Sequence, residues 1–150
     1  MGTLNKKDFF DLVFRVLFSS IFIGLGGEHI FSDLLIQNLM PGWVPYPRLS
    51  SILCGLILIT GGTLIILGIY IRFAVILLGA FIIVVTLSVH FPCLFYTPEN
   101  IAQENAWMWT VLQRSNFVKN LCLLGVCLNL WYHQPQKLSL YYRLNKKKEL

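Results

Sequence analysis

The sequence predicts an all-α membrane protein, a bundle of four transmembrane helices with both termini in the cytoplasm. Two observations lead to this fold class. The chain has 150 residues, of which 56% are hydrophobic and 13% charged, whereas soluble domains carry about twice that share of charge. The apolar residues also gather in long runs, and the mean hydropathy is +0.67. This composition excludes an ordinary soluble domain and indicates a single integral membrane domain over residues 1–150.

Four stretches are long and apolar enough, or nearly so, to cross a bilayer, which takes about 20 residues. They cover residues 9–31, 49–71, 73–91 and 117–132. The second and third are separated by little more than Arg72, which predicts a tight helical hairpin. The first keeps Asp8 and Asp11 near its basic start and lacks a small-x-small cleavage site. We therefore expect an uncleaved helix there rather than a signal peptide.

The basic residues orient the four helices. Four spans place both termini on one side, and the basic residues of that side are Lys6, Lys7, Arg72, Lys137, Arg143 and Lys146–Lys148. Arg48 and Arg114 lie on the other side. The positive-inside rule then puts both ends of the chain, including a basic tail at 133–150, in the cytoplasm.

The net charge of +5 comes largely from these flanking residues. Because no basic stripe is interleaved with base-stacking aromatics, the lipid bilayer is the expected partner and nucleic acid is not. A bacterial inner membrane is the predicted location. The terminal residues Lys147–Leu150 match a dilysine retrieval signal, so the endoplasmic reticulum membrane is the alternative. Of the two external loops, the one near 92–116 is expected to hold an interfacial helix with Trp107 and Trp109 in the headgroups.

Ionisable and amide side chains recur at one depth, towards the external ends of the spans, and they are the candidate ligand-binding residues. They are Glu28, His29, His90, Lys119 and Asn120. An intramembrane charge costs at least about 2.5–3.5 kcal/mol near the bilayer centre, so such residues face the protein interior and are functional candidates. We expect a polar pocket there, with Glu28 paired to Lys119. The alternative is that Lys119 only anchors its helix at the interface.

A polar stripe, the cysteines and Arg15 are further candidates for a structural or functional role. Lys119, Cys122, Val126 and Asn129 share one helix stripe, which is expected to face inward. Cys54, Cys93 and Cys122 are candidate redox residues, although the four cysteines form no CxxC and no zinc-like spacing, and buried cysteine usually acts as a small apolar residue. Arg15 is expected either to snorkel to a lipid phosphate or to support the bundle from the cytoplasmic end.

With these residues in view, the chain resembles the DoxX-like family of small four-helix membrane proteins. The resemblance covers most of residues 15–128 and is carried by "RVLFSSIFIGLGGEHIF", "VPYP", "GLILITGGTLIILGIYIRFAVILLGAFIIVVTLSVHF" and "NFVKNLCLLGVCL". Its most specific part is the block Phe117 to Gly125, preceded by a helix that ends in His90 and Phe91. His90, Lys119 and Asn120 match the family pattern, and that pattern assigns them no role.

The resemblance implies a four-helix membrane bundle with a link to redox or thiol chemistry. Similar proteins include the small subunit of a thiosulfate:quinone oxidoreductase and partners of sulfurtransferases and superoxide dismutases, while eukaryotic ones act as assembly factors or cargo receptors. We therefore expect a subunit or accessory that supports quinone- or thiol-linked redox chemistry, with a redox protein or a second copy as partner and quinone as the cofactor considered. A non-enzymatic scaffold is the alternative, and a small-solute transporter is third because the two halves show no inverted repeat.

Overall fold

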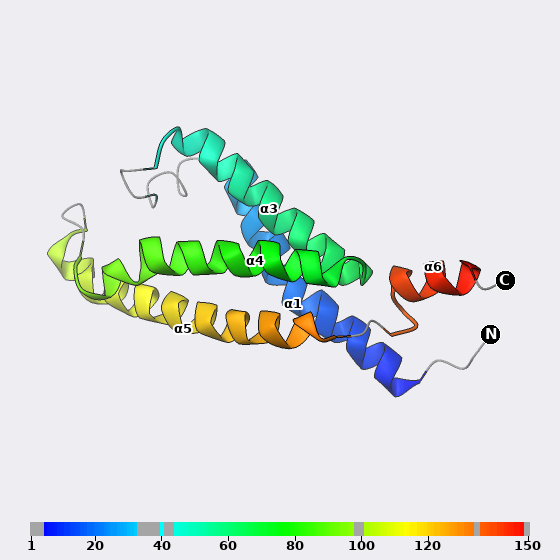
Figure 1. Ribbon diagram of the computed structural model, residues 1–150. Helices are drawn as coiled ribbons and strands as arrows, with labels where there is room; N and C mark the ends of the chain where they lie inside the picture. Colours follow the sequence, from blue (N-terminus) through cyan, green and yellow to red (C-terminus); the bar gives the residue numbers. More distant parts are fainter. Residues whose placement is uncertain (1–4, 33–39, 41–43, 98–100, 134–135, 149–150) are drawn as a thin grey trace.

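The computed structural model describes residues 5–32, 40, 44–97, 101–133 and 136–148, and these are helical with no strand among them (Figure 1). The long helices are α1 (Lys6–Phe31), α3 (Pro47–Leu67), α4 (Ile71–Val85) and α5 (Ala106–Trp131), followed by the short α6 (Leu140–Lys148). The predicted all-α class is therefore confirmed. The start of α1 and the whole of α6 lie at the same end of the molecule.

The helices pack in chain order: α1 lies along α3, α3 against α4, and α4 against α5. Their shared core consists of buried side chains from all four (Phe18, Phe22, Leu58, Ile65, Ile71, Ala74, Val75, Leu78, Ile82, Cys127 and Leu130). Figure 1 shows α4 and α5 running side by side, whereas α1 and α3 cross this pair at an angle. The two pairs diverge towards the end of the molecule at which α1 and α4 end.

Glycines bring the backbones of α1 and α3 into direct contact. A Cβ at Gly55 would lie 2.8 Å from the carbonyl oxygen of Gly26, and a Cβ at Gly26 would lie 2.9 Å from that of Gly55. Membrane helices associate through such close dispersion contacts, because the lipid offers no hydrophobic driving force. The glycine-rich stretches of the sequence therefore become the α1–α3 interface.

The predicted hairpin between the second and third stretches is present. Gly68 ends α3 in the left-handed region at φ 67°, and Tyr70 precedes α4 at φ 49°. A Cβ at Gly68 would also lie only 2.5 Å from Cβ of Ser139. Glycine is thus required at this turn both for its backbone conformation and for the space it leaves to the chain after α5.

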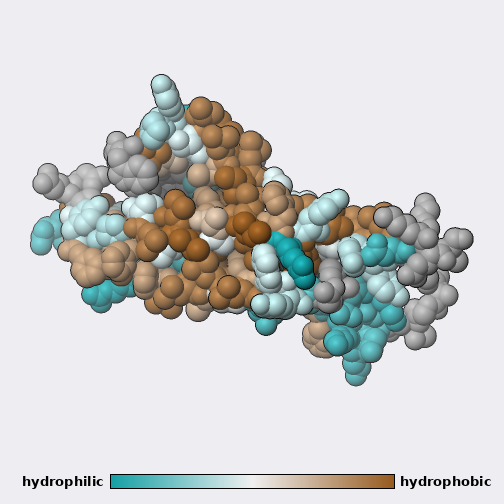
Figure 2. Space-filling model, in the orientation of Figure 1, coloured by the Kyte–Doolittle hydropathy of each residue, from teal (hydrophilic) through white to brown (hydrophobic). Residues whose placement is uncertain are grey.

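Among the described residues, three helices are long and apolar enough to cross a membrane: Lys6–Phe31, Pro47–Leu67 and the continuous segment Ile71–Leu94. Large apolar side chains point outward from them; Leu17 is 68% exposed and Leu87 61%. Figure 2 shows the result on one face, an apolar surface over the middle of the molecule with hydrophilic residues gathered towards its two ends. Outward apolar side chains of this kind are stable in lipid and not in water, so the protein is an integral membrane protein.

Two boundaries differ from the expectation. Helix α5 begins at Ala106 rather than near residue 117, so Trp107 and Trp109 belong to its first turns and not to a separate interfacial helix. The tail, expected only to be basic, contains α6. Hydropathy locates apolar runs and misses polar helical turns, and no proline or glycine interrupts the chain between Ala106 and Gly125.

Candidate functional site

Polar side chains meet between the end of α4 and the first half of α5. We call this group the α4/α5 polar layer; it comprises Thr86, His90, Gln113, Asn116, Lys119 and Asn120. The His90 ring nitrogen Nδ1 lies 2.8 Å from Oε1 of Gln113. The Asn120 amide donates to the Thr86 hydroxyl over 2.9 Å, and both residues are buried. Two cross-helix hydrogen bonds therefore join α4 to α5 inside the protein.

A local change of helix type positions the α4 side of this layer. The helix continues beyond Val85 as a π-helix from Thr86 to His90, closed by a hydrogen bond of 2.8 Å from the Phe91 amide to the Thr86 carbonyl, and then as a 3₁₀ turn at Pro92–Leu94. A π-helical turn is rare and is frequent at functional sites. It gives Thr86 and His90 the orientation in which both meet α5.

The α5 side of the layer follows from ordinary helix spacing. Gln113 and Asn120 are seven residues apart, which places them on one face, and both are buried at 3% and 7% exposure. Cys127 continues the same face. The predicted inward stripe is offset from it: its members Cys122 and Asn129 are exposed. Sequence spacing predicts that a stripe exists, but neighbouring stripes differ by only about 100° of rotation, and packing selects between them.

Lys119 joins the layer from its edge. Its ammonium donates to Oδ1 of Asn116 over 2.8 Å, the side chain is half-buried, and its charge acts electrostatically on the His90 imidazole. In the described part of the chain no hydrogen bond or ion pair joins Lys119 to Glu28. Lys119 is therefore associated with His90 and Asn116, and the expected Glu28 partner lies elsewhere.

Glu28 and His29 belong to the α1–α3 pair. Glu28 is exposed, whereas His29 is half-buried with Nδ1 3.1 Å from the Ser51 hydroxyl. Ser51 donates its single hydroxyl proton to the His29 carbonyl over 2.8 Å, so the His29 Nδ1–H must be the donor to Ser51. The His29 ring meets Phe81 edge-on at 6.4 Å. The five predicted ligand residues are thus divided between two helix pairs that diverge at this end.

The hydrogen bond to Gln113 also determines which ring nitrogen of His90 is free. Because Gln113 Oε1 accepts, the His90 Nδ1 carries the proton and Nε2 presents a lone pair. Nε2 has no hydrogen-bond partner among the described residues. A small ligand at this position would meet an acceptor on His90 and a cationic donor on Lys119.

All four cysteines are free thiols. Cys93 is buried just beyond the π-helix, Cys54 is half-buried on α3, and Cys122 is exposed on α5. Cys93 is hydrogen-bonded to Tyr96, and the charge that its sulfur would carry, together with that bond, raises the pKa of the Tyr96 phenol. Two of the candidate redox residues adjoin the α4/α5 polar layer in sequence: Cys93 is three residues beyond His90, and Cys122 is two residues beyond Asn120.

A second buried polar group, at the opposite end of the molecule, was not predicted as a unit. Arg15 is fully buried; Nε lies 3.0 Å from Oδ2 of Asp11, and the Asp11 Oδ1 lies 2.6 Å from Nε2 of His133. Arg15 also donates through Nη1 to the carbonyls of Ile65 and Ile66 at the end of α3, and through Nη2 to that of Leu138 at 3.2 Å. We call Asp11, Arg15 and His133 the inner hub.

The inner hub resolves the two expectations for Arg15 in favour of support for the bundle. Its guanidinium satisfies the last carbonyls of α3 and ties α1, α3 and the chain after α5 together. The i, i+4 spacing of Asp11 and Arg15 is a signal that the sequence did contain. The third member, His133, is distant in sequence and could be found only from the fold.

Comparison with known proteins agrees with this architecture. The family model of DoxX matches residues 10–91, which includes most of α1, all of α3 and α4, and His90, but ends before α5. No curated protein and no solved structure matches the chain. The match extends over more than half of the 150 residues, and the described residues form membrane-type helices throughout that region. The chain therefore belongs to the DoxX family.

Proposed function

We propose that this protein is a membrane subunit or accessory that supports quinone- or thiol-linked redox chemistry, with the α4/α5 polar layer as its ligand site. The observation that carries the proposal is a half-buried cation, Lys119, whose charge acts on His90, together with a His90 Nε2 that has no hydrogen-bond partner among the described residues. Intramembrane ionisable residues are functional candidates by default, because their insertion into lipid is costly.

The chemistry of these two groups fits a quinone headgroup. The Lys119 ammonium is a hydrogen-bond donor that suits a quinone carbonyl or a small anion, and His90 Nε2 is an acceptor that suits a quinol hydroxyl. His90 is held in this tautomer by Gln113, at 2.8 Å. The site would therefore interact with both oxidation states of one headgroup, and a partner protein would supply the remaining redox groups.

The proposal includes a four-helix topology with both ends in the cytoplasm. α5 is 26 residues long, runs antiparallel to α4 and buries Asn120 and Leu130 against the bundle. A helix of that length rises about 39 Å, enough to cross the hydrocarbon. The basic residues at the end that carries α6 then favour the cytoplasmic side, and a bacterial inner membrane with it, over an endoplasmic reticulum address through Lys147–Leu150.

Extraction of quinone from the purified full-length protein tests the ligand site. We expect quinone to co-purify with the wild type and its retention to fall about tenfold in Lys119→Met, since loss of one charge-assisted hydrogen bond is worth about 1.5–3 kcal/mol. Arg114→Met is the matched control, because Arg114 is an exposed cation on the same helix. A folded wild-type protein that carries no quinone and shows no affinity for added quinone would refute the proposal.

A scaffold function is the second candidate, favoured by one specific observation. Both cross-helix contacts of the layer, His90 with Gln113 and Asn120 with Thr86, are satisfied within the protein. If the protein is an assembly factor or a homo-oligomer subunit, Lys119→Met would lower the midpoint temperature of unfolding. It would not change the affinity for quinone, because the wild type would have none. Crosslinking in the membrane, with the same variant, distinguishes this outcome by identifying a partner protein or a second copy.

A further inference from the structure

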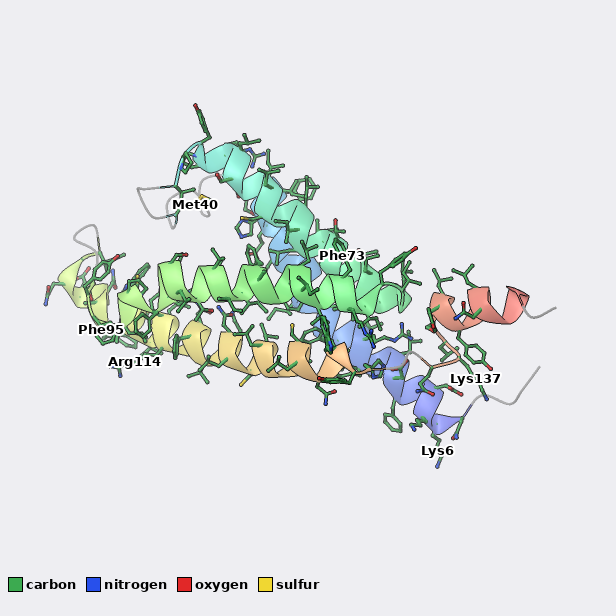
Figure 3. All side chains as sticks on the ribbon, viewed as in Figure 1. Lys6, Met40, Phe73, Phe95, Arg114 and Lys137 are labelled. Atoms are coloured by element: carbon green, nitrogen blue, oxygen red, sulfur yellow. The ribbon has the colours of Figure 1, made fainter. Side chains whose placement is uncertain are left out.

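An open groove lies beside the first turns of α1, at the end of the molecule opposite the α4/α5 polar layer. It has a volume of about 600 Å³ and is lined by Asn5, Lys6, Phe9, Phe10 and Leu138. Figure 3 shows Lys6 and Lys137 at this same end. The groove thus combines one ammonium and one amide with three large apolar side chains.

The apolar side of the groove includes two exposed aromatic side chains. Phe9 and Phe10 are 59% and 66% exposed, with ring centroids 6.0 Å apart. They follow Lys6 by three and four residues, at the point where α1 enters its apolar stretch. A surface that changes from cationic to apolar within one helical turn matches the boundary between lipid headgroups and acyl chains.

The inner hub helps to position Leu138, the groove residue that comes from the chain after α5. Arg15 holds the Leu138 carbonyl at 3.2 Å, and the Lys137 amide donates to Oδ1 of Asp8 at 3.3 Å. Together with the Gln136 amide, which donates to Asp11 at 3.4 Å, these contacts fix the chain after α5 against α1. Leu138 is therefore brought to α1 by buried hydrogen bonds and not by chance proximity.

The acidic residues nearby are already engaged in hydrogen bonds and expose little of their surface to a ligand in the groove. Asp8 is 3% exposed and accepts from the backbone amides of Asn5, at 2.8 Å, and Lys137. Asp11 is 8% exposed and held by Arg15 and His133. Since the Arg15 guanidinium is fully occupied inside the protein, the cation of this groove that faces outward is Lys6, which is exposed.

We propose that this groove binds an anionic phospholipid from the leaflet at this end of the molecule. Lys6 pairs with the headgroup phosphate, while Phe9, Phe10 and Leu138 contact the glycerol and the first acyl methylenes. Charge complementarity commits the site to an anionic lipid, because Lys6 lines the groove, Lys7 is the next residue, and Lys137 lies at the same end of the molecule (Figure 3). α6 flanks the site with exposed Leu140, Tyr141 and Leu144, which suit the same interface.

Lipid retention by the full-length protein, measured by native mass spectrometry, tests this site. The detergent-purified protein is mixed with equal amounts of phosphatidylglycerol and phosphatidylcholine, and the bound lipids are counted. We expect retention of phosphatidylglycerol over phosphatidylcholine, and a preference about fivefold lower in Lys6→Gln, as for one lysine near a charged surface. Lys7→Gln is the matched control: it removes the same charge from the next residue, which does not line the groove.

Two further variants separate the parts of the site. Lys6→Arg keeps the charge and should keep the preference, while Phe10→Ser should lower retention of both lipids because the apolar wall is lost. Equal losses in Lys6→Gln and Lys7→Gln would overturn the proposal, since binding would then follow general surface charge. Equal retention of the two lipids by the wild type would overturn it as well, as would displacement of bound lipid by millimolar inorganic phosphate, which would identify a free anion as the ligand.

Discussion

Replacement of Arg15 by methionine should destabilise the protein more than any other single change of a charged residue considered above. Arg15 is fully buried and contacts Asp11 at 3.0 Å and Leu138 at 3.2 Å, besides the carbonyls of Ile65 and Ile66. Removal of one partner from a buried ion pair costs about 3–5 kcal/mol, because the other charge stays buried and uncompensated. The orphaned carbonyls at the end of α3 add to this loss.

A double variant separates the cost of an unpaired buried charge from the other losses in Arg15→Met. Asp11→Leu combined with Arg15→Met removes both charges, and a buried ion pair replaced by apolar side chains is often neutral or even stabilising. We therefore expect the double variant to recover part of the stability lost in Arg15→Met, because the carbonyls of α3 and Leu138 stay without Arg15 and His133 loses Asp11. Arg15→Lys should be intermediate, since an ammonium keeps the charge but cannot reach Asp11 and the carbonyls of α3 and Leu138 together.

Unfolding in mixed detergent micelles, followed by the circular dichroism of the helices, measures these differences. Arg114→Met is the control, because Arg114 is exposed and should change the free energy of unfolding by less than about 0.5 kcal/mol. A loss of less than about 1 kcal/mol in the free energy of unfolding for Arg15→Met, a value typical of a surface pair, would contradict this prediction. A double variant as unstable as Arg15→Met alone would contradict it as well.

Two other predictions concern helix contacts. Asn120→Leu should lower the free energy of unfolding by about 1–3 kcal/mol, because it leaves the buried Thr86 hydroxyl without its partner at 2.9 Å. Thr86→Val in the same chain should return part of that loss. The same unfolding measurement, arranged as a double-mutant cycle, checks this prediction, and additive losses would contradict it. Gly55→Ala should lower the free energy of unfolding by about 1–3 kcal/mol through overpacking, because the new Cβ would lie 2.8 Å from the carbonyl oxygen of Gly26. Gly24→Ala is the control and should be close to neutral, because nothing lies within 4 Å of its Cβ. Equal effects of the two variants would contradict this prediction.

The candidate site was predicted in part. His90, Lys119 and Asn120 were identified because charged and amide side chains within apolar helices are conspicuous. Their partners Thr86 and Gln113 were not, although the seven-residue spacing of Gln113 and Asn120 was visible. Threonine and glutamine are common near helix ends, and only a neighbouring helix that presents complementary groups at matching depth gives them significance.

The predicted convergence of residues from all the helices depended on depth alone. Depth in the membrane follows from position along each helix, and that position is the ground on which the sequence groups Glu28 and His29 with His90 and Lys119. Lateral position does not follow from sequence in the same way. The α1–α3 pair diverges from the α4–α5 pair at this end, and among the described residues no hydrogen bond or ion pair joins Glu28 to Lys119.

The sequence by itself determined the fold class, the membrane environment, three apolar spans, the α3–α4 turn and the family. Each of these follows from local patterns: long runs of apolar residues, the short break around Arg72 between two of them, and sequence blocks typical of the family. Only the tertiary structure decided which stripe of α5 is buried, which polar residues are paired, and that Arg15 supports α3 and the chain beyond α5. Those outcomes depend on how helices rotate and cross, and the free energies that select among rotations come from contacts between residues far apart in the chain.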